Sequence, residues 1–354
     1  MAAFGDGEVA RSVKVWFTFY SSLTFCYFIC GNIPKGFPRL LSILPIIYFF
    51  IILPLNLSSL LLGGAAGCSI SWLASFKLVL LSFDKGPLSF DLPLHHFLAI
   101  GSLPIYIKES KPSSSSSPSG RVQGLYYYAF EVSVIGLILY TYWYFQQYDY
   151  KPNFIVMYFL YMFLMSFSLE VIIVFCSSLA RLLFDLDVAP PFGNNYLVST
   201  SLHDLWGRRW NLMSSSIFRS VVYEPVRRIF KKSWGIYVAI LATFFVSGLM
   251  HELLFFYMGR KQPCWDVLCF FILHGICLAM EIKVKKLLNG KWQLNRLVST
   301  PLVTGFLTGS YFWLIFPMFE RLRVEIVVIE EIEKFIMLVK DVLVNTAALH
   351  TLGS

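Results

Sequence analysis

Long apolar stretches recur along the whole chain, and they restrict its fold more than any other feature. A helix that crosses a bilayer needs about 20 apolar residues, and the sequence contains about eight stretches of this kind. Of the 354 residues, 57% are hydrophobic and 14% are charged, whereas soluble domains have about 25% charged residues. These values exclude a soluble globular, collagen-like or disordered chain. They predict an all-α, polytopic transmembrane helical bundle.

Short polar turns separate the expected spans. The first span, 13–29, exceeds the apolar core of a signal peptide, so we expect it to be retained. Prolines break the segment 88–106, which favours an interfacial or re-entrant helix. Apolar residues at helical spacing in 329–343 predict an amphipathic helix on a surface. The expected spans are 13–29, 40–57, 60–83, 125–145, 154–175, 234–257, 265–282 and 298–317.

One low-complexity tract divides the chain. Residues 108–121 read KESKPSSSSSPSGR, a composition that cannot bury enough apolar surface to fold, so we expect a flexible loop. The expected organisation is therefore N-terminal spans and an interfacial segment (1–106), a loop (107–124), a main body (125–319) and the tail helix (320–354).

The basic residues set the expected orientation. A net charge of +8 would suggest nucleic-acid binding in a soluble chain, but here the charges lie between apolar stretches. Two spans separate the basic segments 181–232 and 283–296, so both lie on one side, which the positive-inside rule makes the cytosol. Their basic residues are Arg181, Arg208, Arg209, Arg219, Arg227, Arg228, Lys231, Lys232, Lys283, Lys285, Lys286, Lys291 and Arg296. Lys77, near the end of its span, is expected to extend to the lipid headgroups.

Several familiar catalytic and metal-binding motifs are absent or incomplete. The seven cysteines include no CxxC pair, and most lie in apolar segments, so neither a disulfide framework nor a zinc site is expected. The sequence HELLF at 251–255 has Phe255 where the HExxH zinc motif needs its second histidine. HHFLAIG at 95–101 lacks the aspartate of an HHxxxDG motif. No GxSxG, Walker A or dinucleotide-binding motif occurs, and we expect no metal.

Ionisable residues inside spans are functional candidates because their burial in lipid is costly. They are Lys77, Glu131, Glu170, His251, Glu252, His274 and Glu281. His251 lies deep in an apolar helix, and Ser247, one turn earlier, could orient its ring. A neutral imidazole in such a site is a competent general base, because desolvation disfavours its charged form. Asn211 ends a polar segment and offers an amide donor for an oxyanion. The pair suits the transfer of an acyl group to a hydroxyl.

Two long blocks stand out in the sequence, SLHDLWGRRWNLM at 201–213 and VSGLMHELL at 246–254. They resemble the signature blocks of plant wax synthases, within the membrane-bound O-acyltransferase superfamily. The resemblance covers roughly 34–319, with weaker likeness at PKG (34–36), LPLNL (53–57), FK (76–77), GPL (86–88) and FYMGR (256–260). One departure is His203, where the family pattern leads us to expect glutamine.

The resemblance implies a fold of the membrane-bound O-acyltransferase type, with 125–319 as the acyltransferase core. It also implies a multi-pass protein of the endoplasmic reticulum that binds acyl-CoA, a lipid alcohol and membrane lipids, with acyl-CoA as co-substrate and no cofactor. His251 and Asn211 match the family's catalytic pair. Substrate-binding residues are expected at Asp204, Trp206, Arg208, Arg209, Trp210 and Ser247.

The basic residues admit two interpretations. Arg208, Arg209, Arg227, Arg228, Lys231 and Lys232 could meet the phosphates of CoA, or they could serve only to set the topology.

The substrate also has alternatives. A long-chain fatty alcohol, giving a wax ester, is favoured by the two blocks. A sterol or a diacylglycerol presents the same hydroxyl to the same base. A lipid transporter without catalysis would share the composition, but not the dense Trp, Arg and Asn content of 199–213.

Overall fold

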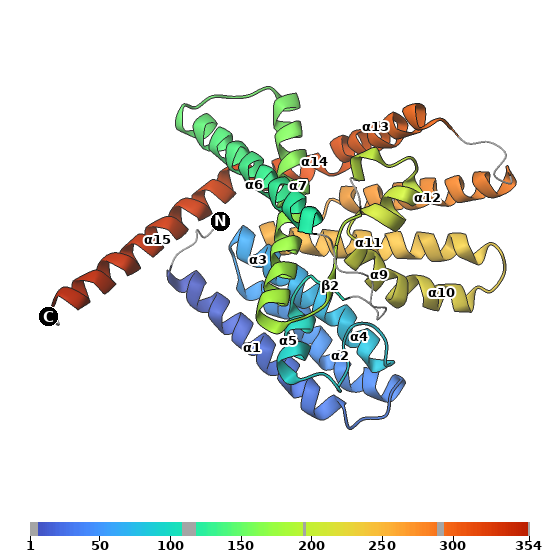
Figure 1. Ribbon diagram of the computed structural model, residues 1–354, viewed down its shortest axis with the longest axis horizontal. Coiled ribbons are helices and arrows are strands. Elements are labelled where there is room, and N and C mark those ends of the chain that lie inside the picture. Colours follow the sequence, from blue (N-terminus) through green and yellow to red (C-terminus); the bar gives the residue numbers. More distant parts are fainter. Residues whose placement is uncertain (1–5, 108–117, 194–195, 289–293, 353–354) are drawn as a thin grey trace.

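Helices account for almost all of the chain in the computed structural model, which describes residues 6–107, 118–193, 196–288 and 294–352 (Figure 1). The all-α prediction is therefore confirmed. A single antiparallel pair of two-residue strands, β1 (Tyr106–Ile107) and β2 (Val188–Ala189), interrupts the helices within these ranges. The helices are α1 (Asp6–Cys30), α2 (Phe37–Ile52), α3 (Leu60–Ala66), α4 (Ser75–Ser82), α5 (Leu94–Ser102), α6 (Pro118–Gln147), α7 (Phe154–Phe184), α8 (Leu202–Asp204), α9 (Leu212–Phe218), α10 (Glu224–Ile229), α11 (Gly235–Gly259), α12 (Asp266–Leu287), α13 (Arg296–Leu314), α14 (Phe316–Leu322) and α15 (Val324–Leu352).

Seven helical segments of the described chain are long and apolar enough to cross a membrane. They confirm a multi-pass membrane protein. These segments are Gly7–Cys30, Phe37–Asn56, Leu60–Ser82, Phe154–Phe184, Gly235–Gly259, Asp266–Leu287 and Arg296–Leu322. The expected span 125–145 lies in α6, which is not among the seven because tyrosines and Glu131 lower its hydropathy. Of the expected loop 107–124, residues 108–117 lie outside the described ranges, and α6 begins at Pro118. Lys291 also lies outside them.

Contacts between the ends of the helices show that α6 runs between the same two sides of the bundle as α7. Glu331, near the start of α15, accepts a hydrogen bond from Leu60 N at the start of α3 (2.6 Å). Tyr161, near the start of α7, donates to Glu325, so the starts of α3, α7 and α15 share one side. His96 donates to the carbonyl of Phe184 (2.8 Å), which places the end of α7 beside α5 on the other side. The chain therefore passes from one side of the bundle to the other between α4 and α7, where α6 lies.

Lys77 does not extend to the membrane surface, so that prediction is wrong. Its side chain has no exposed area, and its ammonium group donates to the carbonyls of Ile100 (2.7 Å) and Leu103 (2.8 Å) at the end of α5. The short helix α5 packs against the third span and α1. It covers the lysine, and its free C-terminal carbonyls supply the acceptors that an ammonium group in apolar surroundings needs.

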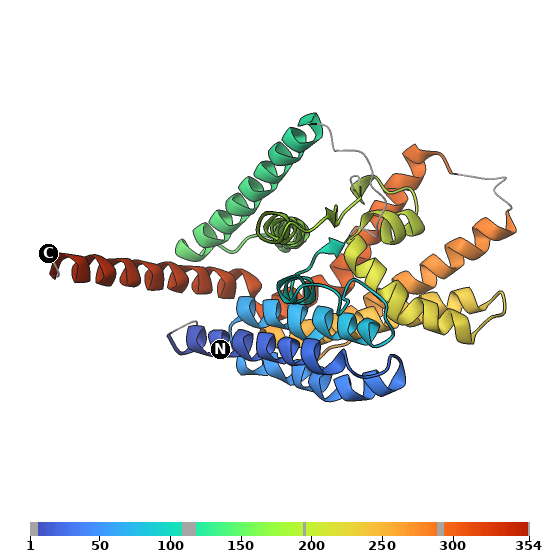
Figure 2. The same ribbon diagram turned by 60° about the horizontal axis from the view of Figure 1, so that its bottom comes forward.

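The apolar core has two main parts. One lies among α1 to α5 and includes Phe19 and Phe50. The other joins α6, α7 and α11 to α15 and includes Tyr161 and Phe319. The tail helix α15 starts in this second part and then projects from the bundle, as both views show (Figures 1 and 2). Its buried first turns give way to exposed apolar residues from Phe335 on, consistent with a helix at a membrane surface.

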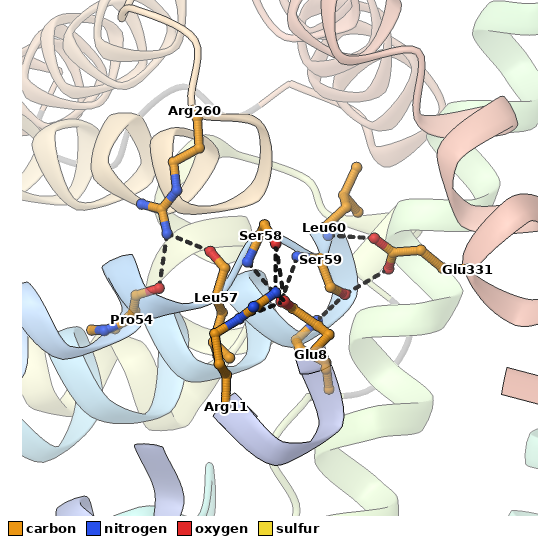
Figure 3. Close-up of polar contacts among 10 residues, drawn as sticks. Glu8, Arg11, Pro54, Leu57, Ser58, Ser59, Leu60, Arg260 and Glu331 are labelled. Atoms are coloured by element: carbon orange, nitrogen blue, oxygen red, sulfur yellow. Dashed lines mark hydrogen bonds and ion pairs between the residues drawn. The ribbon is translucent and has the colours of Figure 1, made fainter. Parts of the chain in front are cut away.

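Two buried carboxylates join the first span, the third span and the tail (Figure 3). Glu331 accepts from Ser59 Oγ (2.8 Å), Leu60 N (2.6 Å) and Leu61 N (3.0 Å). Glu8 accepts from the backbone amides of Ser58 (2.6 Å) and Ser59 (2.8 Å) and pairs with Arg11. Backbone amides at the start of a helix have no partner within the helix and favour negative charge. The two carboxylates therefore fix where α3 begins.

Removing the Glu331 carboxylate should destabilise the bundle. The change Glu331→Ala leaves three donors of the 59–61 turn without their acceptor, and a hydrogen bond to a charged group contributes about 1.5–3 kcal/mol. We expect a loss of at least about 2 kcal/mol, measured by thermal unfolding in detergent. Glu333→Ala, at an exposed site on the same helix, is the control. Equal stability of the two variants would contradict this role of Glu331.

The topology can be tested by labelling single introduced cysteines. Lys232 precedes α11 on the basic side, and Lys261 follows α11 on the opposite side; both are exposed. In sealed microsomes a membrane-impermeant maleimide should label Lys232→Cys at once, but Lys261→Cys only after detergent is added. The reverse pattern would overturn the orientation.

Candidate active site

A cavity of about 1310 Å³ passes between the third span, α7, α11, α12, α13 and the polar segment 196–224. Pockets for a single small ligand are about 300–1,000 Å³, so this one has room for more than one substrate. Pro87, Arg219 and Glu224 line it toward the basic side of the bundle, and Met258 and Ile315 line it toward the other side. The cavity therefore connects the basic surface with the middle of the membrane.

Three π-helical segments contribute to the cavity wall. They are Gly67–Ala74 in the third span, Leu205–Arg209 and Arg219–Tyr223. A π-helical turn is wider than an α-helical turn, and such turns occur frequently at functional sites. Here they direct Trp72 and Trp206 into the wall.

His251 presents an unprotonated nitrogen to the cavity. Its Nδ1 lies 2.7 Å from the carbonyl oxygen of Ser247. A carbonyl can only accept, so Nδ1 carries the hydrogen and Nε2 of the neutral ring keeps its lone pair, to which no group in the described part of the chain donates. The sequence indicated that Ser247 orients the ring, and the structure shows that its backbone carbonyl does so. Any residue at this position has a backbone carbonyl, so orienting the ring does not require the serine side chain. That side chain lines the cavity wall.

Close packing on both sides of α11 fixes the His251 ring. Phe271 of α12 lies 4.3 Å from it between ring centroids, and Trp72 lies 6.2 Å away. Glycines allow these neighbours to approach: a Cβ on Gly248 would lie 2.6 Å from Leu268, and one on Gly67 would lie 2.5 Å from Tyr257. Larger residues at these positions would push α12 or the third span away from α11.

Asn211 combines a local structural role with a free donor. Its backbone is left-handed (φ 37°), a conformation that asparagine tolerates better than most residues. Its Oδ1 accepts from Ser214 N (3.1 Å) and caps α9. The side-chain Nδ2 makes no hydrogen bond within the described ranges, and Asn211 lines the cavity. The cap thus orients the amide and leaves its N–H groups for a substrate oxygen.

Neighbouring segments hold the loop that carries Asn211. Glu281 of α12 accepts from Leu202 N (2.7 Å), where the loop enters α8. The loop also packs against Gly193, whose amide donates to the carbonyl of Arg209 (2.9 Å). A Cβ on Gly193 would lie 2.3 Å from the carbonyl oxygen of Arg208, so only glycine fits there.

The expected substrate-binding residues divide into two groups. Trp206, Trp210 and Ser247 line the same cavity as His251 and Asn211. The other three, Asp204, Arg208 and Arg209, are not in its wall. Arg208 is exposed, and Arg209 donates from Nε to the carboxylate of Asp204 (2.8 Å), which also accepts from Thr200 N. In the structure Asp204 and Arg209 hold the loop together, and a contact of either with substrate stays a prediction.

Other cavity residues were not expected from the sequence. Trp72, Tyr196, Ser214 and Arg219 belong to the wall. Burial raises the pKa of the Tyr196 hydroxyl to about 12, so this group stays neutral, and its ring packs on Trp210 at 4.9 Å. No motif marks these residues, because segments far apart in the sequence bring them together. His203 lines the cavity too, from an exposed position.

Glu252, beside His251, has a structural contact. Its carboxylate accepts from Leu268 N (3.1 Å) in the first turn of α12 and is almost fully buried. Within the described ranges no group of three or more His, Cys, Asp or Glu side chains is arranged to hold a metal ion. Chemically, the site offers a base with a free lone pair and an amide donor in apolar walls. Such a site can remove a proton from a hydroxyl and stabilise an oxyanion.

Comparison with known proteins agrees with this chemistry. Residues 189–273 match the sequence profile of the membrane bound O-acyl transferase family. The chain is 39% identical over 323 residues to acyl-CoA–sterol O-acyltransferase 1 of Arabidopsis thaliana, covering 89% of this chain and 92% of that protein. It is 38% identical over 335 residues to the long-chain-alcohol O-fatty-acyltransferase of Simmondsia chinensis, covering 92% and 94%. It is 40% identical over 312 residues to probable long-chain-alcohol O-fatty-acyltransferase 1 of Arabidopsis thaliana, covering 85% and 89%. The chain therefore belongs to the membrane-bound O-acyltransferase family.

Proposed function

We propose that this enzyme transfers a fatty acyl group from acyl-CoA to a long-chain fatty alcohol and so makes a wax ester. The observation that carries the proposal is that one cavity contains both the free Nε2 of His251 and the amide of Asn211. We further propose that it works in the endoplasmic reticulum membrane, where both substrates can reach it.

The proposed reaction is a direct transfer without an acyl-enzyme. The alcohol oxygen attacks the thioester carbonyl carbon while its proton passes to Nε2 of His251. Asn211 donates to the carbonyl oxygen as it gains negative charge. The C–S bond then breaks, and the imidazolium returns the proton to the CoA thiolate. No net proton is taken up or released, and no further cofactor is needed.

CoA is anionic and soluble, so we propose that it enters from the basic side. Arg219, whose side chain is 73% exposed, lines the cavity there, with Glu224 beside it. Arg228, Lys231 and Lys232 follow on α10 and the turn after it and add positive charge at the entrance. Such groups suit the phosphates of CoA.

Two acceptors have specific support. A fatty alcohol is favoured because the names of several relatives at 35–40% identity include long-chain alcohol. A linear chain also needs a narrower opening than a rigid sterol does, and Phe159 and Phe163 of α7 line the cavity and are exposed. A sterol is the second candidate, because a relative named for sterol acylation is equally similar, at 39% identity.

Loss of His251 should remove most of the activity. General-base catalysis contributes about 10²–10⁴-fold, so His251→Ala should lose that factor in turnover while its abundance in membranes stays normal. The assay is ester formation from radiolabelled acyl-CoA in isolated membranes. His203→Ala should keep measurable activity, although His203 lines the same cavity. A well-expressed His251→Ala enzyme with substantial turnover would remove the assignment.

Variants at Asn211 can separate its cap from its donor. Asn211→Ala loses both, and we expect about 10²–10³-fold lower turnover and about 1 kcal/mol lower stability. Asn211→Asp keeps an oxygen that can cap α9 but has no N–H, so it should be stable and equally inactive. If Asn211→Asp kept wild-type turnover, or if only the Michaelis constant changed, Asn211 would not stabilise the oxyanion.

The acceptor can be identified in yeast that lacks its own neutral-lipid acyltransferases. Membranes containing the enzyme would receive hexadecanol, a sterol or diacylglycerol, each with acetyl-CoA or palmitoyl-CoA. We expect hexadecanol and palmitoyl-CoA to give the fastest ester formation. Sterol esters alone, or preferential acetylation of diacylglycerol, would contradict the wax-ester proposal and leave the His251 and Asn211 roles intact.

A further inference from the structure

A second histidine, His274 of α12, is fully buried and lies outside the cavity wall. Its Nδ1 is 3.2 Å from Nε1 of Trp206, and its Nε2 is 2.9 Å from Oγ of Ser310 on α13. Ser310 Oγ lies 2.7 Å from the carbonyl of Phe306. Four groups from three segments thus form one continuous hydrogen-bond chain.

The direction of every hydrogen bond in this chain is determined. The indole N–H of Trp206 can only donate, so Nδ1 of His274 accepts and Nε2 carries the hydrogen. Nε2 therefore donates to Ser310 Oγ, whose own hydrogen is shared between the carbonyls of Phe306 (2.7 Å) and Leu307 (3.0 Å), which can only accept. Each donor has an acceptor when the histidine is neutral. Phe270 and Phe306 pack against the ring at 4.3 and 4.7 Å and leave no other direction for it.

The residue held at the end of this chain connects both parts of the catalytic site. The Trp206 ring lines the cavity and packs on Phe271 (6.3 Å), which in turn lies 4.3 Å from His251. The backbone carbonyl of Trp206 accepts from Ser215 Oγ (3.1 Å), in the helix that Asn211 caps. A shift of the indole would therefore disturb the contacts around His251 and around Asn211.

We propose that His274 is a positioning residue for acyl transfer: it fixes the indole of Trp206 through its Nδ1 and so keeps the wall between His251 and Asn211 in place. The proposal rests on the acyltransferase reaction proposed above. In this proposal His274 does not contact the substrate, and it takes no part in proton transfer to or from the alcohol.

Three substitutions at His274 separate its two hydrogen bonds. Asparagine places an acceptor near the position of Nδ1, so it keeps the hydrogen bond to Trp206. Glutamine places a donor near the position of Nε2, so it keeps only the hydrogen bond to Ser310. Leucine keeps neither hydrogen bond. A misplacement of about 1 Å near a site can reduce turnover by about 10²-fold. We expect His274→Leu and His274→Gln to lose about 10- to 100-fold in turnover, and His274→Asn to lose much less. Equal losses in His274→Asn and His274→Gln would overturn the proposal.

A double-mutant cycle tests whether His274 acts through Trp206. Trp206→Phe removes the indole N–H, so adding His274→Leu should change turnover less than about twofold further. An additive loss in the double variant would mean that His274 acts in another way. Ser299→Ala on α13 is a control variant that should keep wild-type turnover, because Ser299 is also buried but lies outside both the hydrogen-bond chain and the cavity wall.

A second measurement does not depend on the reaction. The chain has nine tryptophans, and in indole-¹⁵N-labelled protein the N–H signal that disappears in Trp206→Phe belongs to Trp206. This signal should stay near its position in His274→Asn and move upfield in His274→Gln and His274→Leu. An unchanged signal in all three variants would overturn the proposal, whichever acceptors the enzyme uses. If the signal moved as expected but the wild-type enzyme used none of the offered acceptors, the proposed function alone would fail.

Discussion

An unpaired polar group in hydrocarbon costs several kcal/mol, and much of this structure follows from that cost. Lys77 is buried in the bundle because the end of α5 supplies two carbonyls to it. Glu331 is buried because the start of α3 supplies amides and a hydroxyl. His274 is buried because Trp206 and Ser310 satisfy both of its nitrogens. Each pair also joins segments that are far apart in the sequence, so the polar contacts determine how the apolar helices are arranged.

His251 and Asn211, the proposed catalytic pair, differ from these groups because part of each side chain makes no hydrogen bond within the described residues. The second nitrogen of His251 and the amide nitrogen of Asn211 lie at the cavity, while the other half of each side chain is fixed by the backbone. The backbone contacts orient the two groups before any substrate arrives, and preorganised donors and bases need little rearrangement in the transition state. The turns of the π-helical segments are wider than α-helical turns, and they leave space in the cavity that α-helices alone would fill.

The sequence predicts the helical bundle and the positions of the spans well, and it singles out His251 and Asn211, whose catalytic roles stay a prediction. Apolar length determines spans directly, and the blocks around the pair are long and specific. It predicts less well what depends on contacts between distant segments. The burial of Lys77 depends on α5, and the role of the Ser247 backbone depends on the rotamer of His251. Neither the bond between Arg209 and Asp204 nor the place of Trp72 in the wall follows from a local pattern.

The central claim is that acyl transfer occurs between His251 and Asn211. The most direct test is a cryo-EM structure in a nanodisc with an acyl-CoA analogue in which a methylene group replaces the thioester sulfur, so that no transfer can occur. The account predicts that the analogue's carbonyl oxygen lies within hydrogen-bond distance of Asn211 Nδ2, with its carbonyl carbon facing His251 Nε2 and the CoA phosphates near Arg219. A carbonyl bound away from both residues, with the cavity around His251 filled only by lipid, would contradict the account.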